Sequence, residues 1–315
     1  MSDPRTAFYC VSNEIYFLGA AALVNSLRLV GHTEPIFVLD CGLTNPQREL
    51  LRPHATLVPA LSEAPPWLLK TVAPLRHPAE VMVLIDADIV VTRPLTEPIE
   101  AAARGRVVAV EHGADRFFPE WGRLLGLGNP RPRTYVSSSL VLLGRELGRK
   151  VIGLMHGAQP RADTAGSPFS TATPEDALSV NVRPEIVEDP FFFPDQDVLN
   201  AVLATQVDRE QVVVLDRRLE AIIPFEGLRV VDESRLQCAY EDGLEPYAVH
   251  HVAAKPWLEE TAYGVYTQLL LRLLLGRDVA VRLRLRDLPP HLRIGLRGYA
   301  SRKLEGAFSR LRAST

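Results

Sequence analysis

The chain has 315 residues, 47% of them hydrophobic and 23% charged, with a formal net charge of −3. This length allows one large domain or two small ones, and the balanced charge gives no indication of nucleic-acid binding. Three cysteines without metal or redox spacing, Cys10, Cys41 and Cys238, indicate a reducing compartment rather than a disulfide scaffold. The first residues do not resemble a signal peptide, and no uncharged apolar segment is as long as a membrane helix. We therefore expect a soluble, cytoplasmic protein.

The N-terminal third alternates between strand and helix patterns. Ala7 to Val11 predicts a strand, Ile15 to Val30 a helix and Ile36 to Leu39 a second strand. The Asn45-Pro46 pair is typical of a helix start with proline in the first turn. Such alternation predicts an α/β fold with a mostly parallel sheet covered by helices.

The central feature of the sequence is a buried strand that ends in two carboxylates. Val81 to Ile85 is a run of branched apolar residues, which suits a strand buried on both faces, and Asp86 and Asp88 follow with only Ala87 between them. Two carboxylates about 4 Å apart repel by about 4 kcal/mol at an effective dielectric near 20, and a hard divalent cation would offset this. The pair either caps a turn or binds a metal at the sheet edge, where open α/β sheets bind ligands.

The middle of the chain contains two further strands and one irregular segment. Val107 to Val110 and Ser138 to Leu143 predict strands, separated by a loop-like stretch rich in glycine and proline. The segment from Gln159 to Pro184 is rich in Ala, Thr, Ser and Pro. It is either a lid over an acceptor site or a solvated loop without function.

Two later stretches carry groups that could take part in chemistry. Pro194 followed by Asp195 and Gln196 predicts a helix start, and capping alone would not require the glutamine. A short apolar strand then leads to His250 and His251. The two histidines should point to opposite faces, so at most one of them easily joins the carboxylates.

The C-terminal region is strongly basic. Residues 261 to 315 carry a net charge of +8, against −11 for the remainder of the chain. Val279 to Arg286 alternates apolar residues with arginine, which predicts a half-exposed strand. Leu292 to Leu311 could form a basic amphipathic segment. It would either make a peripheral contact with the inner face of an anionic membrane or pack against the acidic remainder of the chain.

Several stretches, taken in order over roughly residues 7 to 257, resemble glycosyltransferase family 8, which includes glycogenin and bacterial lipopolysaccharide galactosyltransferases. The motifs are CVSNEIYFLGAAALVNSL from Cys10, DADIVVTRPL from Asp86, YVSSSLVLLG from Tyr135, DQDVLNAVL from Asp195 and HHVAAKPW from His250. The resemblance implies a GT-A fold, a mostly parallel mixed sheet flanked by helices. It also implies transfer of a sugar, such as glucose or galactose, from a UDP-sugar with retention of configuration, using Mn²⁺ or Mg²⁺.

The resemblance also implies roles for particular residues. The metal ligands would be Asp86, Asp88 and His250. The nucleotide would contact Val11, Asn13, Ala87 and Ser137, with Lys255 on the diphosphate, and Asp195 and Gln196 would lie beside the transferred sugar. Retention could come from trapping of the anomeric carbon by Gln196 or Asp195. Alternatively, the acceptor could attack from the leaving-group side, with the diphosphate as base. We prefer the second mechanism because glutamine is a poor nucleophile.

Two departures from the family pattern bear on the substrates. Ser137, Ser138 and Ser139 stand where the family commonly has Asn-Ser-Gly, which affects a sugar or acceptor contact. The turn after the histidines lacks the usual glycine and is about one residue short. This leaves His250 and His251 as alternative ligands. We favour His250, because His251 then occupies a position where the family has an aromatic residue.

The expected organisation is a catalytic domain over residues 1–257, with a nucleotide-binding half to about 110 and an acceptor half containing the insertion at 159–184, and a basic extension over residues 258–315. Three other functions share features with parts of the sequence. A non-catalytic sugar-nucleotide-binding protein would have the same site without turnover. A haloacid-dehalogenase-type phosphatase would use the IDADIVV stretch, but the expected later acidic pair is not evident and the motif lies far from the start. A nucleotidyltransferase would need a glycine-rich basic loop after the first strand, which is missing.

Overall fold

The structure is a computed structural model that describes residues 3–62, 64–162, 188–252, 255–259 and 264–293. Most of the expected insertion at 159–184 and most of the expected amphipathic segment from Leu292 to Leu311 lie outside these residues. Within the described part of the chain, no helix is both long enough and apolar enough to cross a bilayer.

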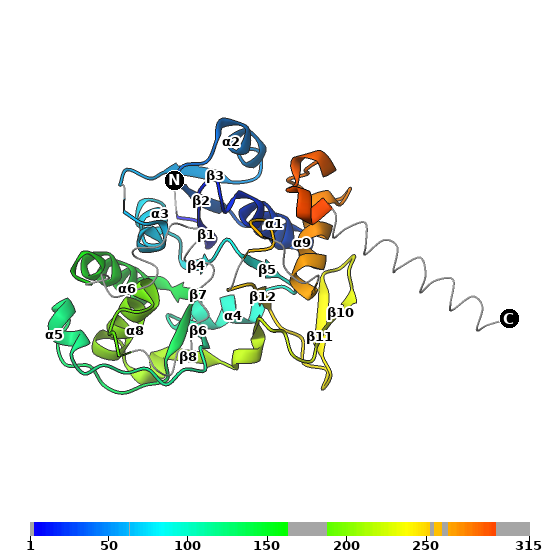
Figure 1. Cartoon of the computed structure of the whole chain (residues 1–315). Helices are drawn as coiled ribbons and strands as arrows, with labels where there is room; N and C mark the ends of the chain where they lie inside the picture. Colours follow the sequence, from blue (N-terminus) through cyan, green and yellow to red (C-terminus); the bar gives the residue numbers. More distant parts are fainter. Residues whose placement is uncertain (1–2, 63, 163–187, 253–254, 260–263, 294–315) are drawn as a thin grey trace.

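Seven strands of the described residues form the main sheet (Figure 1). In sheet order they are β3 (Thr56–Pro59), β2 (Ile36–Asp40), β1 (Thr6–Ser12), β4 (Val81–Ile85), β7 (Val136–Gly144), β6 (Val107–Glu111) and β8 (Val212–Leu215). The first four are parallel to one another, β7 is antiparallel to both neighbours, and β6 is parallel to β8. The expected mostly parallel mixed sheet is confirmed.

Helices cover both faces of this sheet, so that two hydrophobic cores form. One face packs against α1 (Phe17–Leu29), α4 (Thr96–Ala102) and α9 (Val265–Leu275). The other packs against α3 (Val72–Arg76), α5 (Trp121–Leu125), α6 (Arg145–Ala158) and α8 (Pro194–Gln206). Strand β1 shows the reason, because its side chains alternate: Phe8 and Cys10 enter the first core, and Ala7 and Tyr9 the second. Helix α2 (Asn45–Leu51) contacts the edge strand β3.

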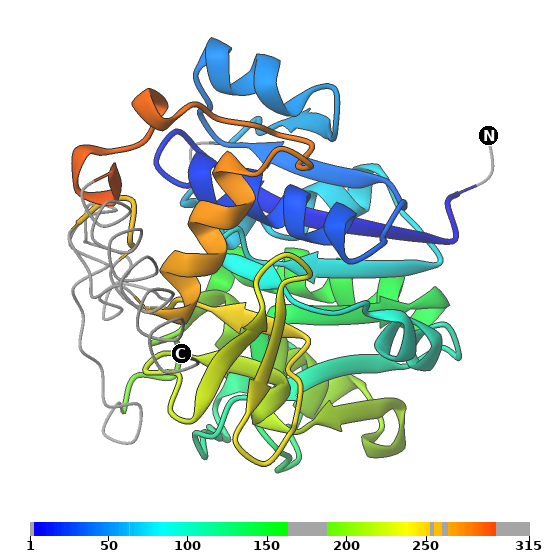
Figure 2. The same cartoon turned by 90° about the vertical axis from the view of Figure 1, so that its right-hand side faces the viewer.

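A second, small sheet is important for the site. It consists of β5 (Ile89–Val91), β12 (Ala248–His250) and β9 (Glu220–Ile222), with β12 in the middle. Strand β12 runs antiparallel to β5 and parallel to β9. A hairpin of β10 (Leu228–Asp232) and β11 (Gln237–Tyr240) lies beside α9 in Figures 1 and 2.

The first part of the basic C-terminal region is built into the fold. Helix α9 packs across α1 (Figure 2), and buried Asn25 of α1 donates from Nδ2 to the carbonyl oxygens of Leu273 and Val281, each at 2.8 Å. Asn25 Oδ1 also accepts the Val281 N–H at 2.7 Å. A buried amide whose hydrogen-bonding groups are satisfied in this way fixes the position of both segments.

Two expectations about local structure are wrong. Val279 to Arg286 is not a strand: its backbone is irregular and leads into the 3₁₀ turn Leu285–Asp287. The alternation arises because Val281 and Leu283 pack into the core beside α9 while Arg282 and Arg284 are exposed. The stretch after β6, expected to be only a loop, contains the short helix α5.

Candidate functional site

The two carboxylates lie on a tight turn between β4 and β5. The Asp86 N–H donates to the Ser139 carbonyl oxygen at 2.8 Å, and the Ile89 N–H donates back to the Asp86 carbonyl oxygen at 3.2 Å. Helix α1 approaches the turn closely at Gly19, where an added Cβ would lie 2.4 Å from the Ala87 carbonyl oxygen. Only glycine fits there, so the first helix of the chain packs directly against the turn.

Strand β12 brings His250 to this turn. His250 lies opposite Ile89 in the antiparallel pair of β12 and β5, directly beyond Asp88. Its Nε2 lies 3.3 Å from Asp88 Oδ1. Asp86, Asp88 and His250 each offer a ligand atom, and these atoms lie within 4.8 Å of one another. The structure thus brings together the three residues that the sequence suggested as ligands.

His251 occupies a different environment, as strand alternation predicted. Its ring packs against Tyr266, with centroids 5.1 Å apart, and against Phe225 at 6.1 Å. Between the two candidate histidines, only His250 belongs to the acidic cluster in the described residues.

The donor set is suited to a hard divalent cation. Two carboxylates and one imidazole are ligands that Mn²⁺ accepts readily, and Mg²⁺ also binds through one or two carboxylates. The side chain of Asp86 is 26% exposed, so the cluster opens to solvent on one side, where water and phosphate oxygens could complete a coordination shell. The residues present therefore fit a metal of this class.

Two lysines also touch the acidic turn. Lys255 Nζ lies 2.5 Å from Asp88 Oδ2 and also donates to the His251 carbonyl oxygen. Lys70 Nζ lies 2.6 Å from Asp86 Oδ1 and 2.6 Å from Asp195 Oδ2. Lys70 was not identified from the sequence, because a single lysine after a short 3₁₀ turn, Pro66–Leu69, carries no recognisable pattern.

The first turn of α8 forms the opposite wall of the site. Asp195 Oδ2 accepts a hydrogen bond from the Ser138 hydroxyl at 2.7 Å, and Gln196 Oε1 accepts the Ser138 backbone N–H at 3.1 Å. Gln196 Nε2 is buried and has no hydrogen-bond partner among the described residues. The amide is therefore held in place by its oxygen.

A buried ion pair anchors this helix start. Asp197 is fully buried and accepts hydrogen bonds from Arg116 at 3.0 and 3.2 Å and from the Tyr135 hydroxyl at 2.7 Å. It also accepts the Phe193 backbone N–H at 2.8 Å. These contacts fix the first turn of α8, and with it the positions of Asp195 and Gln196.

Ser137 and Ser139 point away from Asp195, because strand residues alternate. Their hydroxyls are hydrogen-bonded to each other, and the Ser139 hydroxyl donates to Glu220 Oε1 at 2.5 Å. Glu220 in turn accepts from His250 Nδ1 at 2.7 Å. Like Lys70, Glu220 was not anticipated, because it lies in a strand of three residues without a motif around it.

The charges of the cluster are strongly interdependent. Burial raises the pKa of Asp86 to about 6, although the Lys70 ammonium opposes the shift. Burial would also raise the pKa of Asp88, but Lys255 and His250 outweigh it and hold that pKa below its usual range. Burial disfavours the charged form of His250, yet the neighbouring carboxylates, Asp88 first, raise its pKa to about 10.

The residues expected near the nucleotide base lie at the same edge of the sheet. Val11 and Asn13 are at the carboxyl end of β1, which pairs in parallel with β4. Asn13 Oδ1 accepts the Tyr16 N–H at 3.0 Å and so shapes the turn before α1. Buried Lys255 lies with its Nζ 5.9 Å from the centroid of the Tyr16 ring.

Comparison with known proteins identifies the fold. No protein-family model matches the chain, and no curated protein sequence matches it. Among solved structures, the apo structure of the bifunctional glycosyltransferase WbbM matches with a TM-score of 0.51 and 15% identity over 86% of this chain. The matched region spans 50% of the WbbM chain. A structure of the galactosyltransferase LgtC with donor and acceptor sugar analogs matches with a TM-score of 0.49 and 13% identity, covering 86% of this chain and 98% of that one. The expected GT-A fold is confirmed.

Proposed function

We propose that the chain is a metal-dependent glycosyltransferase that moves a sugar, such as glucose or galactose, from a UDP-sugar to an acceptor with retention of configuration. The observation that carries the proposal is the convergence of Asp86, Asp88 and His250 at the carboxyl end of β4. In open α/β sheets this edge is where ligands bind. The fold shared with the bifunctional glycosyltransferase WbbM supports the same class of reaction.

On the donor side, the chain would bind a metal and a diphosphate together. Asp86, Asp88 and His250 would hold Mn²⁺ or Mg²⁺, which when bound would supply positive charge to the phosphate oxygens. Lys255, whose ammonium already lies 2.5 Å from Asp88, would place a second positive charge on the same phosphates. Charge placed there stabilises the transition state more than the ground state, because the leaving diphosphate becomes more negative as its bond to the sugar breaks.

On the sugar side, Asp195 and Gln196 would bind rather than attack. Asp195 is paired with Lys70 and accepts from Ser138, and both contacts stabilise its carboxylate and lower its nucleophilicity. Gln196 has its oxygen occupied by the Ser138 N–H, so it offers only N–H donors. We therefore infer that retention comes from attack on the leaving-group side, with the diphosphate as base, rather than through a covalent intermediate.

The remaining assignments are also proposals. Val11, Asn13, Ala87 and Ser137 would contact the nucleotide of the donor. The basic residues beyond Arg293 would make a peripheral contact with anionic membrane. Flotation with anionic vesicles of a chain ending at Arg293, which keeps α9, tests this: binding equal to that of the full chain would dismiss the membrane contact.

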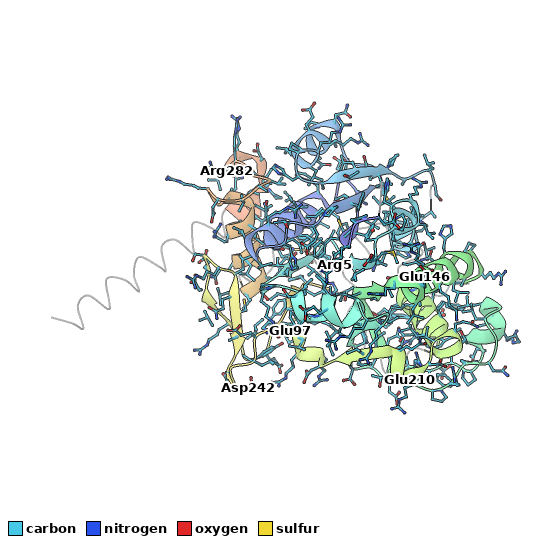
Figure 3. The ribbon with its side chains drawn as sticks, turned by 180° about the vertical axis from the view of Figure 1, so that it is seen from behind. Arg5, Glu97, Glu146, Glu210, Asp242 and Arg282 are labelled. Atoms are coloured by element: carbon cyan, nitrogen blue, oxygen red, sulfur yellow. The ribbon has the colours of Figure 1, made fainter. Side chains whose placement is uncertain are left out.

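Calorimetric titration of UDP with and without Mn²⁺ tests the proposed function. UDP should bind much more tightly with the metal, and Asp88→Asn should remove this dependence. Asp242→Asn is the matched control, since Asp242 (Figure 3) is exposed. Its carboxylate pairs with Arg218 at 2.5 Å. UDP binding that ignores Mn²⁺ would contradict the proposal.

A screen of UDP-sugars by thermal shift with Mn²⁺ should then identify the donor, because the specific ligand stabilises the folded state most. Hydrolysis or transfer of that donor distinguishes an enzyme from a binding protein. Metal-dependent UDP binding without turnover of any UDP-sugar would favour a non-catalytic sugar-nucleotide-binding protein.

A further inference from the structure

We propose that Glu220 is a positioning residue of the metal centre: it holds the His250 ring so that Nε2, and not Nδ1, is presented to the metal beside Asp88. This inference rests on the proposed function, since it concerns the same site. It adds a residue that touches neither the metal nor the substrate and that acts through the imidazole.

The strand register places the two side chains together. Strands β9 and β12 are parallel, with Glu220 paired to Ala248 and Ile222 paired to His250. Glu220 and His250 are therefore diagonal neighbours on one face of the small sheet. Their side chains meet with His250 Nδ1 2.7 Å from Glu220 Oε1, and neither is more than 7% exposed.

This contact decides which ring nitrogen can bind a cation. A neutral imidazole has one N–H donor and one lone pair, and a carboxylate can only accept. An imidazole that binds a metal must be neutral, so Nδ1 must then carry the proton that it donates to Glu220. This leaves the lone pair on Nε2, the atom 3.3 Å from Asp88 Oδ1. A carboxylate behind a metal-binding histidine commonly fixes the ring and increases its basicity in this way.

The hydrogen bonds of Glu220 differ from those of a carboxylate with a structural role. Glu220 Oε2 is buried and has no hydrogen-bond partner among the described residues. The buried Asp197, by contrast, pairs with a guanidinium and also accepts from a hydroxyl and a backbone N–H. Glu220 accepts hydrogen bonds from His250 and from the Ser139 hydroxyl, so the charge of this carboxylate is balanced through the imidazole and through any cation that the imidazole binds.

Ser139 belongs to the same arrangement. Its hydroxyl donates to Glu220 Oε1 at 2.5 Å, and its carbonyl oxygen accepts the Asp86 N–H at 2.8 Å. One residue of β7 therefore touches both the carboxylate behind His250 and the turn that carries Asp86. A glycine at this position would keep the backbone contact to Asp86 and lose the hydroxyl that donates to Glu220.

The test measures Mn²⁺ affinity by calorimetry in the presence of UDP for the full chain and for Glu220→Gln, Glu220→Ala and Ser139→Gly. We expect Mn²⁺ to bind about 10- to 100-fold more weakly in both Glu220 variants, the range found for lost partners of metal-bound histidines. Ser139→Gly should have a smaller effect in the same direction. Glu97→Gln is the control, because Glu97 lies on α4 (Figure 3) and accepts from the Tyr247 hydroxyl at 2.5 Å.

A second measurement separates positioning from a general loss of structure. The ring nitrogens of His250, observed by ¹⁵N NMR with Mg²⁺ and UDP, should report the Nδ1–H tautomer in the full chain and a mixture of tautomers in Glu220→Gln. Mn²⁺ affinity within about threefold of the full chain in folded Glu220 variants, or an unchanged tautomer, would overturn the inference. If the unmodified chain shows no Mn²⁺-dependent UDP binding, the proposed function itself fails and this inference with it.

Discussion

Lys255 Nζ lies 2.5 Å from Asp88 Oδ2, so a cation of the chain itself holds a carboxylate of the proposed metal site. If Asp88 held a metal instead, the Lys255 ammonium would be available to pair with the phosphates. We expect Lys255→Met to bind Mn²⁺ alone at least as well as the unmodified chain. In the presence of Mn²⁺ it should bind UDP about tenfold to hundredfold more weakly, since a hydrogen bond to a charged group contributes about 1.5–3 kcal/mol.

Calorimetry with and without UDP checks this prediction. Lys150→Met is the control, because Lys150 is exposed and donates to the Gln206 carbonyl oxygen at 2.9 Å, on α6 and away from the site. Equal loss of affinity for Mn²⁺ alone and for UDP would mean that Lys255 only supports the turn.

Lys70 bridges the two walls of the site, with Nζ at 2.6 Å from both Asp86 and Asp195. Lys70→Met would leave two largely buried carboxylates facing each other without a cation. Removing one partner of a buried pair costs about 3–5 kcal/mol, and because Asp86 is 26% exposed we expect a loss near the lower end, about 3 kcal/mol. Urea denaturation measures the loss, and Mn²⁺ should restore part of it by neutralising Asp86. A variant as stable as the full chain, with the same response to Mn²⁺, would contradict the bridging role.

Gly19 sets the distance between α1 and the acidic turn. In Gly19→Ala the new methyl group would lie 2.4 Å from the Ala87 carbonyl oxygen and 2.8 Å from Trp257 Cη2, so helix or turn must move. We expect a loss of about 1–3 kcal/mol in stability, typical of overpacking, together with weaker Mn²⁺ binding. Gly153→Ala in α6 is the matched control, since its Cβ would meet nothing within 4 Å and should stabilise the helix by up to about 1 kcal/mol. If both variants keep the metal affinity of the full chain, the close approach at Gly19 does not position the site.

The parts of the site that the sequence predicted carry strong local patterns. A run of branched apolar residues ending in Asp86 and Asp88 indicates a buried strand, and Pro194 before Asp195 indicates a helix start, and both elements are present. The choice between His250 and His251 depends on strand register, which becomes visible only when β12 is paired with β5. A shift of one residue would exchange the two rings.

The residues that were missed act over long separations in the chain. Lys70 lies far before Asp195, and Glu220 reaches Ser139 across 81 positions, so no local pattern could connect them. The error at Val279 to Arg286 has a different cause. An extended backbone packed beside a helix produces the same alternation of buried and exposed residues as a strand, and hydrophobic periodicity does not show whether a partner strand exists.

His32 is a buried histidine remote from the acidic turn, and its hydrogen bonds require the neutral ring. Its Nε2 accepts the Leu95 N–H at 2.9 Å, and its Nδ1 lies 3.1 Å from Glu34 Oε2. Burial lowers the pKa of His32 below 6.5, with Glu34 opposing the shift and Arg28 adding to it. The unfolded chain therefore binds a proton below about pH 6.5 that the folded chain does not, so stability falls as the pH drops through that value.

We expect the contribution of His32 to the free energy of unfolding to fall by up to about 1.4 kcal/mol for each pH unit below about 6.5, until the folded protein also takes up the proton. His32→Gln keeps an acceptor for the Leu95 N–H and should flatten the pH dependence, whereas His77→Gln, at an exposed histidine, should not. Urea denaturation of the three proteins between pH 5.5 and 8 measures the difference. An identical pH slope in the full chain and His32→Gln would show that the buried ring takes up its proton in the folded protein as readily as in the unfolded chain.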